Sequence, residues 1–384
     1  MSEKTTLILG GGIGGLTTAT HLRRLAPAEH RIVLVERSRT FMACMSHLWI
    51  MTGERRDPAE GARELARLAE SGIEVVATEI ESIDPRAKTV QTTEGVLEAD
   101  YLVVALGAEK KPGAIPGLAE GAFNLYDQEG ALQIQRALEE FDGGRIVVLI
   151  SRTPFSCPSA PYEAAFLIDS VLRERGVRER TELALYTPED TPMLVAGPSI
   201  GPALVEMLKE RGIELHWEEL TMKIDPVAKK ILFELSDTTY DLLVGIPPHV
   251  APAALSGSGL VDASGWVPVD PETLATKFDG VFAIGDATAV RLANGMFLPK
   301  AGVFADEQAR TVAARIAAEV SGGDADGRYD GRGFCYIEVG DGMAAYGSGN
   351  FYGIPSPRVT MEDPSERFRT EKAGIERDLL ALLD

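Results

Sequence analysis

Cysteine is scarce in this chain of 384 residues, which has only Cys44, Cys157 and Cys335. No two of them have the Cys-x-x-Cys spacing that is typical of zinc sites and thioredoxin-like motifs. Purely structural disulfides belong mainly to secreted proteins, and the first residues of this chain do not resemble a secretory signal. The sequence therefore predicts no metal centre, and any disulfide among these cysteines is expected to be catalytic.

The chain also has fewer basic than acidic residues, and it has no long apolar run. The chain has 38 Lys and Arg residues against 58 Asp and Glu residues, a formal net charge of −20. Nucleic acid is not an expected partner, because phosphate binding requires the opposite charge. No apolar run reaches the length of about 18 residues that a membrane-spanning helix needs. Together with the missing signal, this predicts a cytoplasmic protein.

The chain opens with a strand, a glycine-rich turn, a helix and a second strand, over residues 6–35. The turn contains Gly10-x-Gly12-x-x-Gly15, which allows a tight bend, a close approach of the backbone to a pyrophosphate, and close packing of helix on strand. A carboxylate 21 residues further on, Glu36, can accept hydrogen bonds from ribose hydroxyls. The candidate dinucleotide contacts in this segment are Gly10, Gly12, Gly14, Gly15, Glu36 and Arg37.

A second strand-helix pattern begins near residue 143, and a strand at 280–286 returns the chain to the first unit. The sequence thus predicts an α/β fold with two Rossmann-like, doubly wound domains and a small C-terminal α+β domain. The expected boundaries are 1–112 with 250–322, 113–249, and 323–384. The expected helices are 16–25, 61–71, 160–175, 199–211, 301–319 and one from about 364, and short strands are expected within 334–352.

The second domain lacks the glycine-rich loop that a second nucleotide would need. Residues 151–163, which follow its first strand, contain no glycine and three prolines. Proline has no backbone N–H to offer a phosphate. The sequence therefore predicts that NADH and NADPH do not bind in the usual mode, and the turn carries Cys157 instead.

Two segments resemble the flavin motifs of flavoproteins with two dinucleotide-binding domains. Val281-Phe-Ala-Ile-Gly-Asp286 is similar to the motif whose Asp binds the ribitol chain, and Ala105-Leu-Gly-Ala108 is similar to its companion. The resemblance implies bound FAD, with a helix near 298–304 aimed at the N1–C2=O edge of the flavin. Lys300 either adds positive charge there or is a solvated lysine. The contacts expected from these segments are Ala105, Gly107, Gly285, Asp286, Lys300, Ala301 and Gly302.

Residues 142–148 and 154–163 resemble the flavoprotein subunit of flavocytochrome c sulfide dehydrogenases, and they are similar to sulfide:quinone oxidoreductases. The resemblance implies a redox-active disulfide between Cys157 and Cys335 that HS⁻ attacks, and an acid/base role for Glu163. The alternatives are two inert buried thiols and a glutamate that only stabilises the start of a helix.

Cys44 lies eight residues after Glu36. In the flavocytochrome c sulfide dehydrogenases a cysteine at this spacing carries FAD covalently, so the resemblance implies a thioether to the flavin. The alternative is a small apolar residue in the wall of the flavin site. Residues 108–140 hold no cysteine, a departure from many sulfide:quinone oxidoreductases.

The resulting prediction is an FAD enzyme that oxidises sulfide or a persulfide donor and passes electrons to quinone. The alternatives are a flavoprotein subunit that reduces a cytochrome or another redox protein, a type II NADH dehydrogenase, and a redox sensor that does not turn over. The tail at 375–384 is amphipathic but acidic, which predicts at most a peripheral contact with the inner face of the plasma membrane. The sequence leaves homo-oligomer formation open.

Overall fold

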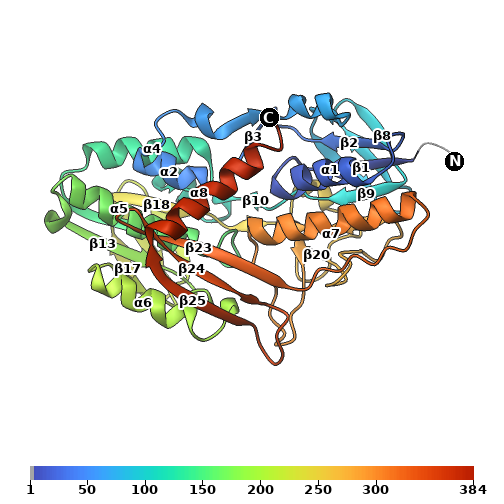
Figure 1. Cartoon of the computed structure of the whole chain (residues 1–384). Coiled ribbons are helices and arrows are strands. Elements are labelled where there is room, and N and C mark those ends of the chain that lie inside the picture. Colours follow the sequence, from blue (N-terminus) through green and yellow to red (C-terminus); the bar gives the residue numbers. More distant parts are fainter. Residues whose placement is uncertain (1–3) are drawn as a thin grey trace.

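A five-stranded parallel sheet forms the frame of the first domain in the computed structural model, which describes residues 4–384 (Figure 1). Its strands lie in the order β21 (Val281–Ala283), β9 (Tyr101–Val104), β1 (Thr5–Leu9), β2 (Arg31–Val35) and β5 (Glu74–Val76). The chain leaves this sheet after β9 and returns to it with β21.

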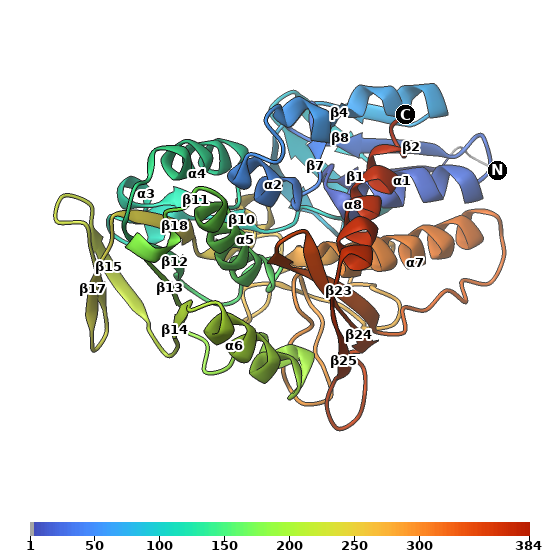
Figure 2. The same cartoon turned by 60° about the vertical axis from the view of Figure 1, so that its left-hand side comes forward.

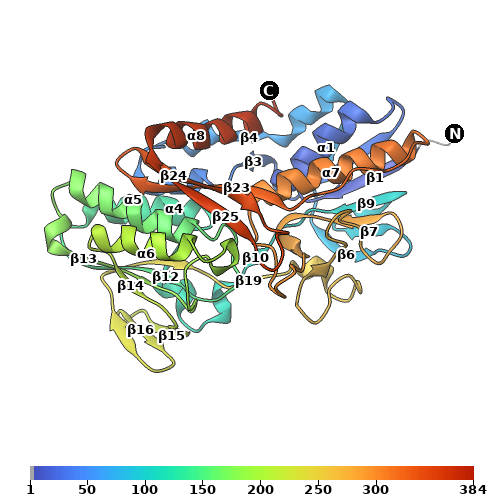
Figure 3. The same cartoon turned by 60° about the horizontal axis from the view of Figure 1, so that its bottom comes forward.

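Both faces of this sheet are covered, which explains why its strands are almost wholly apolar. Ile8 and Leu34 point toward α1 (Ile13–Leu25) and α7 (Gly302–Val320), two helices that lie side by side. Figure 3 shows this pair along one face of the sheet. Leu7 and Val33 point to the opposite face, which packs against a small antiparallel sheet made of β6 (Ile80–Asp84), β7 (Thr89–Thr92) and β8 (Gly95–Glu98).

The second domain repeats this plan. Its parallel sheet has the order β11 (Phe123–Asn124), β18 (Leu242–Ile246), β12 (Gly144–Ile150), β13 (Thr181–Tyr186) and β14 (Glu214–His216). One face packs against α4 (Gln128–Glu140), α5 (Ala160–Glu174) and α6 (Ile200–Glu210). The other face packs against an antiparallel sheet that projects from the far end of the molecule (Figure 2), formed by β15 (Thr221–Asp225), β16 (Lys230–Phe233) and β17 (Asp237–Thr239).

The C-terminal segment joins the two domains. Three antiparallel strands, β23 (Arg332–Gly340), β24 (Met343–Asn350) and β25 (Arg358–Ser365), are followed by α8 (Glu366–Leu380), whose first turn Ser365 caps. Strand β23 packs against α5 of the second domain. The end of the chain returns to the first domain, where the Asp384 carboxylate contacts Arg63 at 2.9 Å and Arg67 at 2.6 Å.

Most of the expected long helices are confirmed, but the helix expected at 61–71 is wrong. Its first residues form strand β4 (Ala62–Glu64), which pairs with β3 (Thr40–Met42), and residues 65–71 form a 3-10 helix. Leu65 and Leu68 are buried with a spacing of three residues, which suits a 3-10 helix as well as an α-helix. The remaining α-helices and β-strands are α2 (Ser46–Thr52), α3 (Leu118–Gly121), β10 (Glu109–Lys110), β19 (His249–Val250), β20 (Val267–Pro268) and β22 (Thr288–Ala289).

Strand β25 was not expected from the sequence, and the domain boundaries at 112, 249 and 322 stay predictions. Among residues 4–384, no helix is both long and apolar enough to cross a membrane.

Candidate functional site

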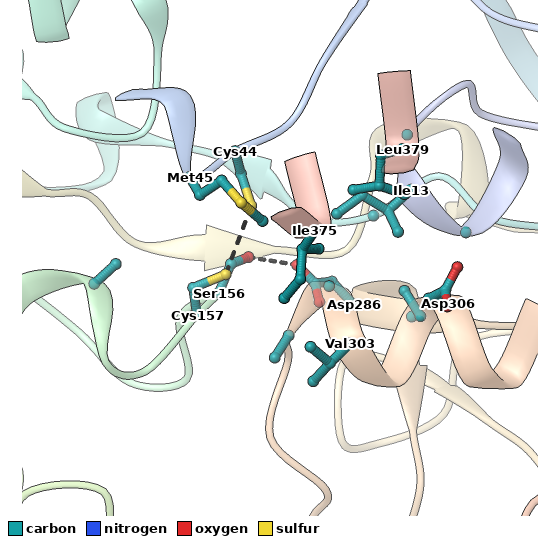
Figure 4. A pocket seen from close by; sticks show the side chains of 18 of the residues that line it. Ile13, Cys44, Met45, Ser156, Cys157, Asp286, Val303, Asp306, Ile375 and Leu379 are labelled. Atoms are coloured by element: carbon teal, nitrogen blue, oxygen red, sulfur yellow. Dashed lines mark hydrogen bonds between the residues drawn. The ribbon is translucent and has the colours of Figure 1, made fainter. Parts of the chain in front are cut away.

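A cavity of about 680 Å³ lies where the first domain, the second domain and the C-terminal segment meet. Its size is within the range of pockets that hold a drug-sized ligand or cofactor. Figure 4 shows Ile375 and Leu379 of α8 pointing toward it, opposite Val303 and Asp306 of α7. The cavity is therefore built from segments that are far apart in the sequence.

The glycine-rich turn forms one end of this cavity, and its three motif glycines have different surroundings. Gly10 has a φ of +107°, and a Cβ there would lie 2.4 Å from the Ala105 carbonyl oxygen. A Cβ on Gly15 would lie 1.8 Å from the Gly10 carbonyl oxygen, so this glycine allows α1 to pack against the strand. A Cβ on Gly12 would meet no atom within 4 Å. No protein contact requires glycine at position 12, and this suits a backbone that a ligand approaches closely.

Two helices begin at the cavity, and neither has a side-chain cap. Helix α1 starts after Gly12 and α7 after Ala301, and neither has an acidic residue in its first turn. Their free backbone N–H groups and the positive ends of their dipoles are therefore available to a ligand. Such a pair suits a ligand with a pyrophosphate and a ring that gains negative charge on reduction.

The other residues expected at the dinucleotide site lie partly inside the cavity and partly behind it. The Glu36 carboxylate accepts hydrogen bonds from the backbone N–H groups of Gly11 at 2.7 Å and Ser38 at 2.8 Å, which fixes it beside the glycine turn. Arg37 is exposed and lies 3.9 Å from Glu79. The expected residues that line the cavity are Gly12, Gly14, Cys44, Ala105, Gly107, Cys157, Glu163, Gly285, Asp286, Ala301, Gly302 and Cys335.

Lys300 is buried rather than solvated, and it does not line this cavity. Its ammonium donates hydrogen bonds to the carbonyl oxygens of Asp286 at 2.6 Å and Thr288 at 3.1 Å. It also lies 3.3 Å from the centre of the Trp266 ring. Burial lowers the pKa of Lys300 to about 8. Lys300 therefore orders the loop that carries Asp286, and its charge reaches the cavity only from behind.

The thiols of Cys44 and Cys157 face one another across the cavity, with 3.7 Å between their sulfur atoms (Figure 4). Cys157 has a φ of +47°, in the left-handed region that non-glycine residues seldom occupy. Its backbone N–H donates a hydrogen bond to the Lys300 carbonyl oxygen at 2.6 Å. The loop between β12 and α5 thus holds Cys157 in one defined position beside the flavin motif.

Cys335 enters the same cavity from β23. Its thiol donates a hydrogen bond to the Ser159 hydroxyl oxygen at 3.2 Å, and Ser159 is only two residues from Cys157. All three cysteines are free thiols in this structure, and all three line one cavity. The fold therefore gathers the residues that the sequence singled out, and the disulfide between Cys157 and Cys335 stays a prediction.

A buried group of charges lies beside Cys335. The Lys372 ammonium of α8 contacts Glu163 of α5, and it lies 2.9 Å from the Glu338 carboxylate of β23. The Glu338 carboxylate also forms an ion pair with the Arg369 guanidinium at 2.7 Å and accepts a hydrogen bond from the Trp49 indole N–H at 2.8 Å. With both carboxylates ionised, the two cations balance their charge.

Burial raises the pKa of Glu163, and Lys372 only partly offsets this effect. Burial and the negative charge of Glu163 raise the pKa of the Cys335 thiol to about 11. Lys372 and Glu338 were missed in the sequence. The available signal was a lone charged residue in the apolar run Ile337-Glu338-Val339, all of which is buried. Glu163 is thus a buried carboxyl group placed to exchange a proton close to Cys335.

In the second domain, the positions that would bind a nucleotide are occupied by protein. Glu189 follows β13 much as Glu36 follows β2, but its carboxylate accepts hydrogen bonds from the Tyr162 hydroxyl at 2.7 Å and the Thr187 hydroxyl at 2.9 Å. Tyr162 belongs to the first turn of α5 and is fully buried. A ribose would have to displace this tyrosine, which supports the prediction that the loop does not hold NADH.

Comparison with known proteins gives a consistent result. The family model for pyridine nucleotide-disulphide oxidoreductases matches residues 4–309. The mitochondrial sulfide:quinone oxidoreductase of Mus musculus is 29% identical over 303 residues, which cover 73% of this chain and 65% of that protein. The type II NADH:quinone oxidoreductase of Staphylococcus haemolyticus is 25% identical over 370 residues, which cover 89% of both chains.

The fold can also be compared with a solved structure. The crystal structure of the sulfide:quinone oxidoreductase from Aquifex aeolicus superimposes with a TM-score of 0.89 at 25% identity, over 99% of this chain and 91% of that one. The match includes the C-terminal segment, which lies beyond the part that the family model covers.

Proposed function

Because this chain belongs to the pyridine nucleotide-disulphide oxidoreductase family, we propose that it is an FAD-dependent enzyme that oxidises sulfide and passes the electrons to a quinone. One observation carries the proposal. Three cysteines and Glu163 line the cavity that begins at the open glycine turn, while the second nucleotide loop offers no phosphate cradle. The similarity to sulfide:quinone oxidoreductases points to the same substrates.

The residues at the first glycine turn fit FAD. The turn at Gly12 and the start of α1 would hold the pyrophosphate, and Glu36 would accept from the ribose. Asp286 would bind the ribitol chain, with Ser156 holding its carboxylate at 2.5 Å. The flavin supplies a two-electron acceptor next to the cysteines and can release the electrons to a second substrate.

In the proposed sulfur chemistry, Cys157 and Cys335 form a disulfide that HS⁻ attacks. A new S–S bond forms between the incoming sulfur and Cys335, the Cys157–Cys335 bond breaks, and Cys157 leaves as a thiolate. The proton of HS⁻ stays on the persulfide. The placement of Cys335 against Ser159, two residues from Cys157, supports this pairing.

Glu163 would hold or release the proton that this chemistry moves at Cys335. Its carboxylate is buried, its raised pKa brings it closer to the working pH, and it raises the pKa of Cys335. Lys372 positions Glu163 and keeps its charge balanced.

Quinone is the preferred acceptor because the named relatives of both groups are quinone reductases. Quinones reside in membranes, so the proposal includes peripheral membrane contact. An activity assay that offers either a soluble short-chain quinone or cytochrome c as the electron acceptor distinguishes the two classes of acceptor. Sulfide-dependent reduction of the quinone is expected, and reduction of cytochrome c without quinone activity would favour the alternative of a subunit that reduces a redox protein.

Single serine variants of the two cysteines test the sulfur chemistry. Cys157→Ser and Cys335→Ser should each retain FAD, because neither side chain belongs to the glycine turn, and each should lose sulfide-dependent flavin reduction. The measurement is anaerobic stopped-flow absorbance together with the flavin content of each variant. Reduction of Cys335→Ser at the wild-type rate would contradict this chemistry.

A further inference from the structure

Cys157 faces the thiol of Cys44, which the proposed function does not use, and Cys335 lines the same cavity. We propose that Cys157 is the central cysteine of a three-thiol exchange centre, in which its disulfide bond moves between Cys335 and Cys44. The Cys335 half of this proposal rests on the proposed function. The Cys44 half rests on the geometry of the cavity alone.

The direct observation is the contact between Cys44 and Cys157. Their sulfur atoms lie 3.7 Å apart, and the two side chains point toward one another (Figure 4). A disulfide bond is about 2.05 Å long, so bond formation needs an approach of less than about 2 Å. Cys335, by contrast, donates its thiol hydrogen to Ser159.

The backbone explains which partner moves. Cys157 has a φ of +47° and its N–H is held by the Lys300 carbonyl oxygen, so this residue is fixed. Unusual backbone conformations of this kind gather at functional sites. Cys44 lies in the turn between β3 and α2, outside regular structure, and is exposed to the cavity. Bond formation would therefore require the turn that carries Cys44 to shift toward Cys157.

The exchange step is balanced without an oxidant. The Cys335 thiolate attacks the Cys157 sulfur, a Cys157–Cys335 bond forms, the Cys44–Cys157 bond breaks, and Cys44 departs as a thiolate. The proton lost from Cys335 is taken up by the Glu163 carboxylate or by water. In the reverse direction the Cys44 thiolate attacks the Cys157 sulfur, the Cys157–Cys335 bond breaks, and Cys335 departs as a thiolate that takes up a proton, while Cys157 stays in a disulfide.

This assignment of Cys44 competes with the covalent flavin link that the sequence resemblance implies. A sulfur bonded to the flavin cannot exchange with Cys157. The two assignments therefore predict different modifications of the peptide that contains Cys44: a disulfide with the Cys157 peptide, or a bound flavin.

Disulfide mapping tests the proposal directly, because trypsin places the three cysteines on three peptides, 40–55, 153–173 and 333–358. Purified flavin-loaded protein is equilibrated in glutathione redox buffers, trapped with N-ethylmaleimide at acidic pH and digested without reduction. Wild type should give both the 40–55/153–173 and the 153–173/333–358 linked pairs. Cys335→Ser should give only the first pair, Cys44→Ser only the second, and Cys157→Ser neither.

Two results would overturn the proposal. One is the absence of the 40–55/153–173 pair from both wild type and Cys335→Ser, in a buffer where Cys44→Ser forms its own pair. The other is a 40–55 peptide that carries the mass of a flavin. Sulfide-dependent flavin reduction is measured on the same wild-type sample. Its loss with both linked pairs present contradicts the proposed function alone, and its presence without the first pair contradicts only the exchange centre.

Discussion

The two strand-turn-helix units of this protein have the same order of elements, but the residues in their turns differ in kind. The turn before α1 contains glycines, leaves open space at Gly12, and ends in a helix with no acidic residue in its first turn. The turn before α5 contains no glycine, and its helix has Glu163 in the first turn. A helix start with free N–H groups suits a phosphate, whereas one with its own carboxylate does not.

The acidic residues at the ends of the second strands show the same contrast. Glu36 accepts hydrogen bonds from the backbone N–H groups of Gly11 and Ser38, and it lies beside the open loop. Glu189 accepts from Tyr162 and Thr187, which are both buried. The comparison teaches that a Rossmann-like unit can be kept as scaffold while its loop changes from binding a phosphate to presenting a thiol.

The largest expected effect concerns Glu163, the carboxylate in the first turn of α5, and the lysine that balances its charge. Lys372→Met should lower the free energy of unfolding by about 3–5 kcal/mol, because Glu163 and Glu338 lose their shared buried cation. The loss should shrink as the pH falls, since protonation removes the buried negative charge and a group with a raised folded pKa contributes least stability at high pH. Urea denaturation between pH 5 and pH 8 measures it.

Lys209→Met is the matched control for this variant. Lys209 is largely exposed and forms a surface pair with Glu206 at 3.3 Å, so its loss should change the stability by less than about 1 kcal/mol. Equal losses in the two variants would show that the buried group of charges does not stabilise the protein as described.

The glycine turn gives the next largest effect, and two of its glycines, Gly12 and Gly15, should respond differently. Gly15→Ala should destabilise the fold by about 1–3 kcal/mol, because its Cβ would lie 1.8 Å from the Gly10 carbonyl oxygen. Gly12→Ala meets no atom within 4 Å and should change the stability of the flavin-free protein by at most about 0.5 kcal/mol. It should nevertheless weaken flavin binding about tenfold or more, the cost of one lost hydrogen bond to a phosphate.

Thermal denaturation of flavin-free protein and equilibrium flavin binding measure these two effects separately. If Gly12→Ala binds flavin as tightly as wild type, the open space at Gly12 does not receive the pyrophosphate.

A smaller effect concerns the proton chemistry at Cys335. With a pKa of about 11, the reduced Cys335 thiol should react slowly with iodoacetamide at pH 8, and its rate should rise about tenfold per pH unit below that pKa. Glu163→Gln should speed this reaction up to about tenfold, because the removed negative charge had disfavoured the thiolate. Peptide mass spectrometry follows the modification of residues 333–358, and an unchanged or slower rate would contradict the role of Glu163.

The sequence predicted the frame of this site better than its supporting contacts. Glycine spacing reveals the open turn because Gly10 and Gly15 leave no room for a side chain, and the absence of glycine from 151–163 is equally informative. The group around Lys372 could not be predicted, because its members come from α5, β23 and α8 and meet only in the folded chain. The contact between Cys44 and Cys157 also depends on how the two domains are joined.

The helix expected at 61–71 was wrong for a related reason. The pairing of β4 with β3 decides the local structure there, and this pairing is a tertiary contact that a local pattern does not contain.

The contrast between the two loops is tested most directly by an anaerobic titration of the flavin-loaded protein, first with sulfide and in a separate sample with NADH. The flavin absorbance near about 450 nm, a property of the cofactor, reports its reduction. Sulfide should bleach this band in stoichiometric steps, and NADH should leave it unchanged over the same time. Rapid, saturable bleaching by NADH without a response to sulfide would contradict the account, because the loop that carries Cys157 would then be serving a nucleotide.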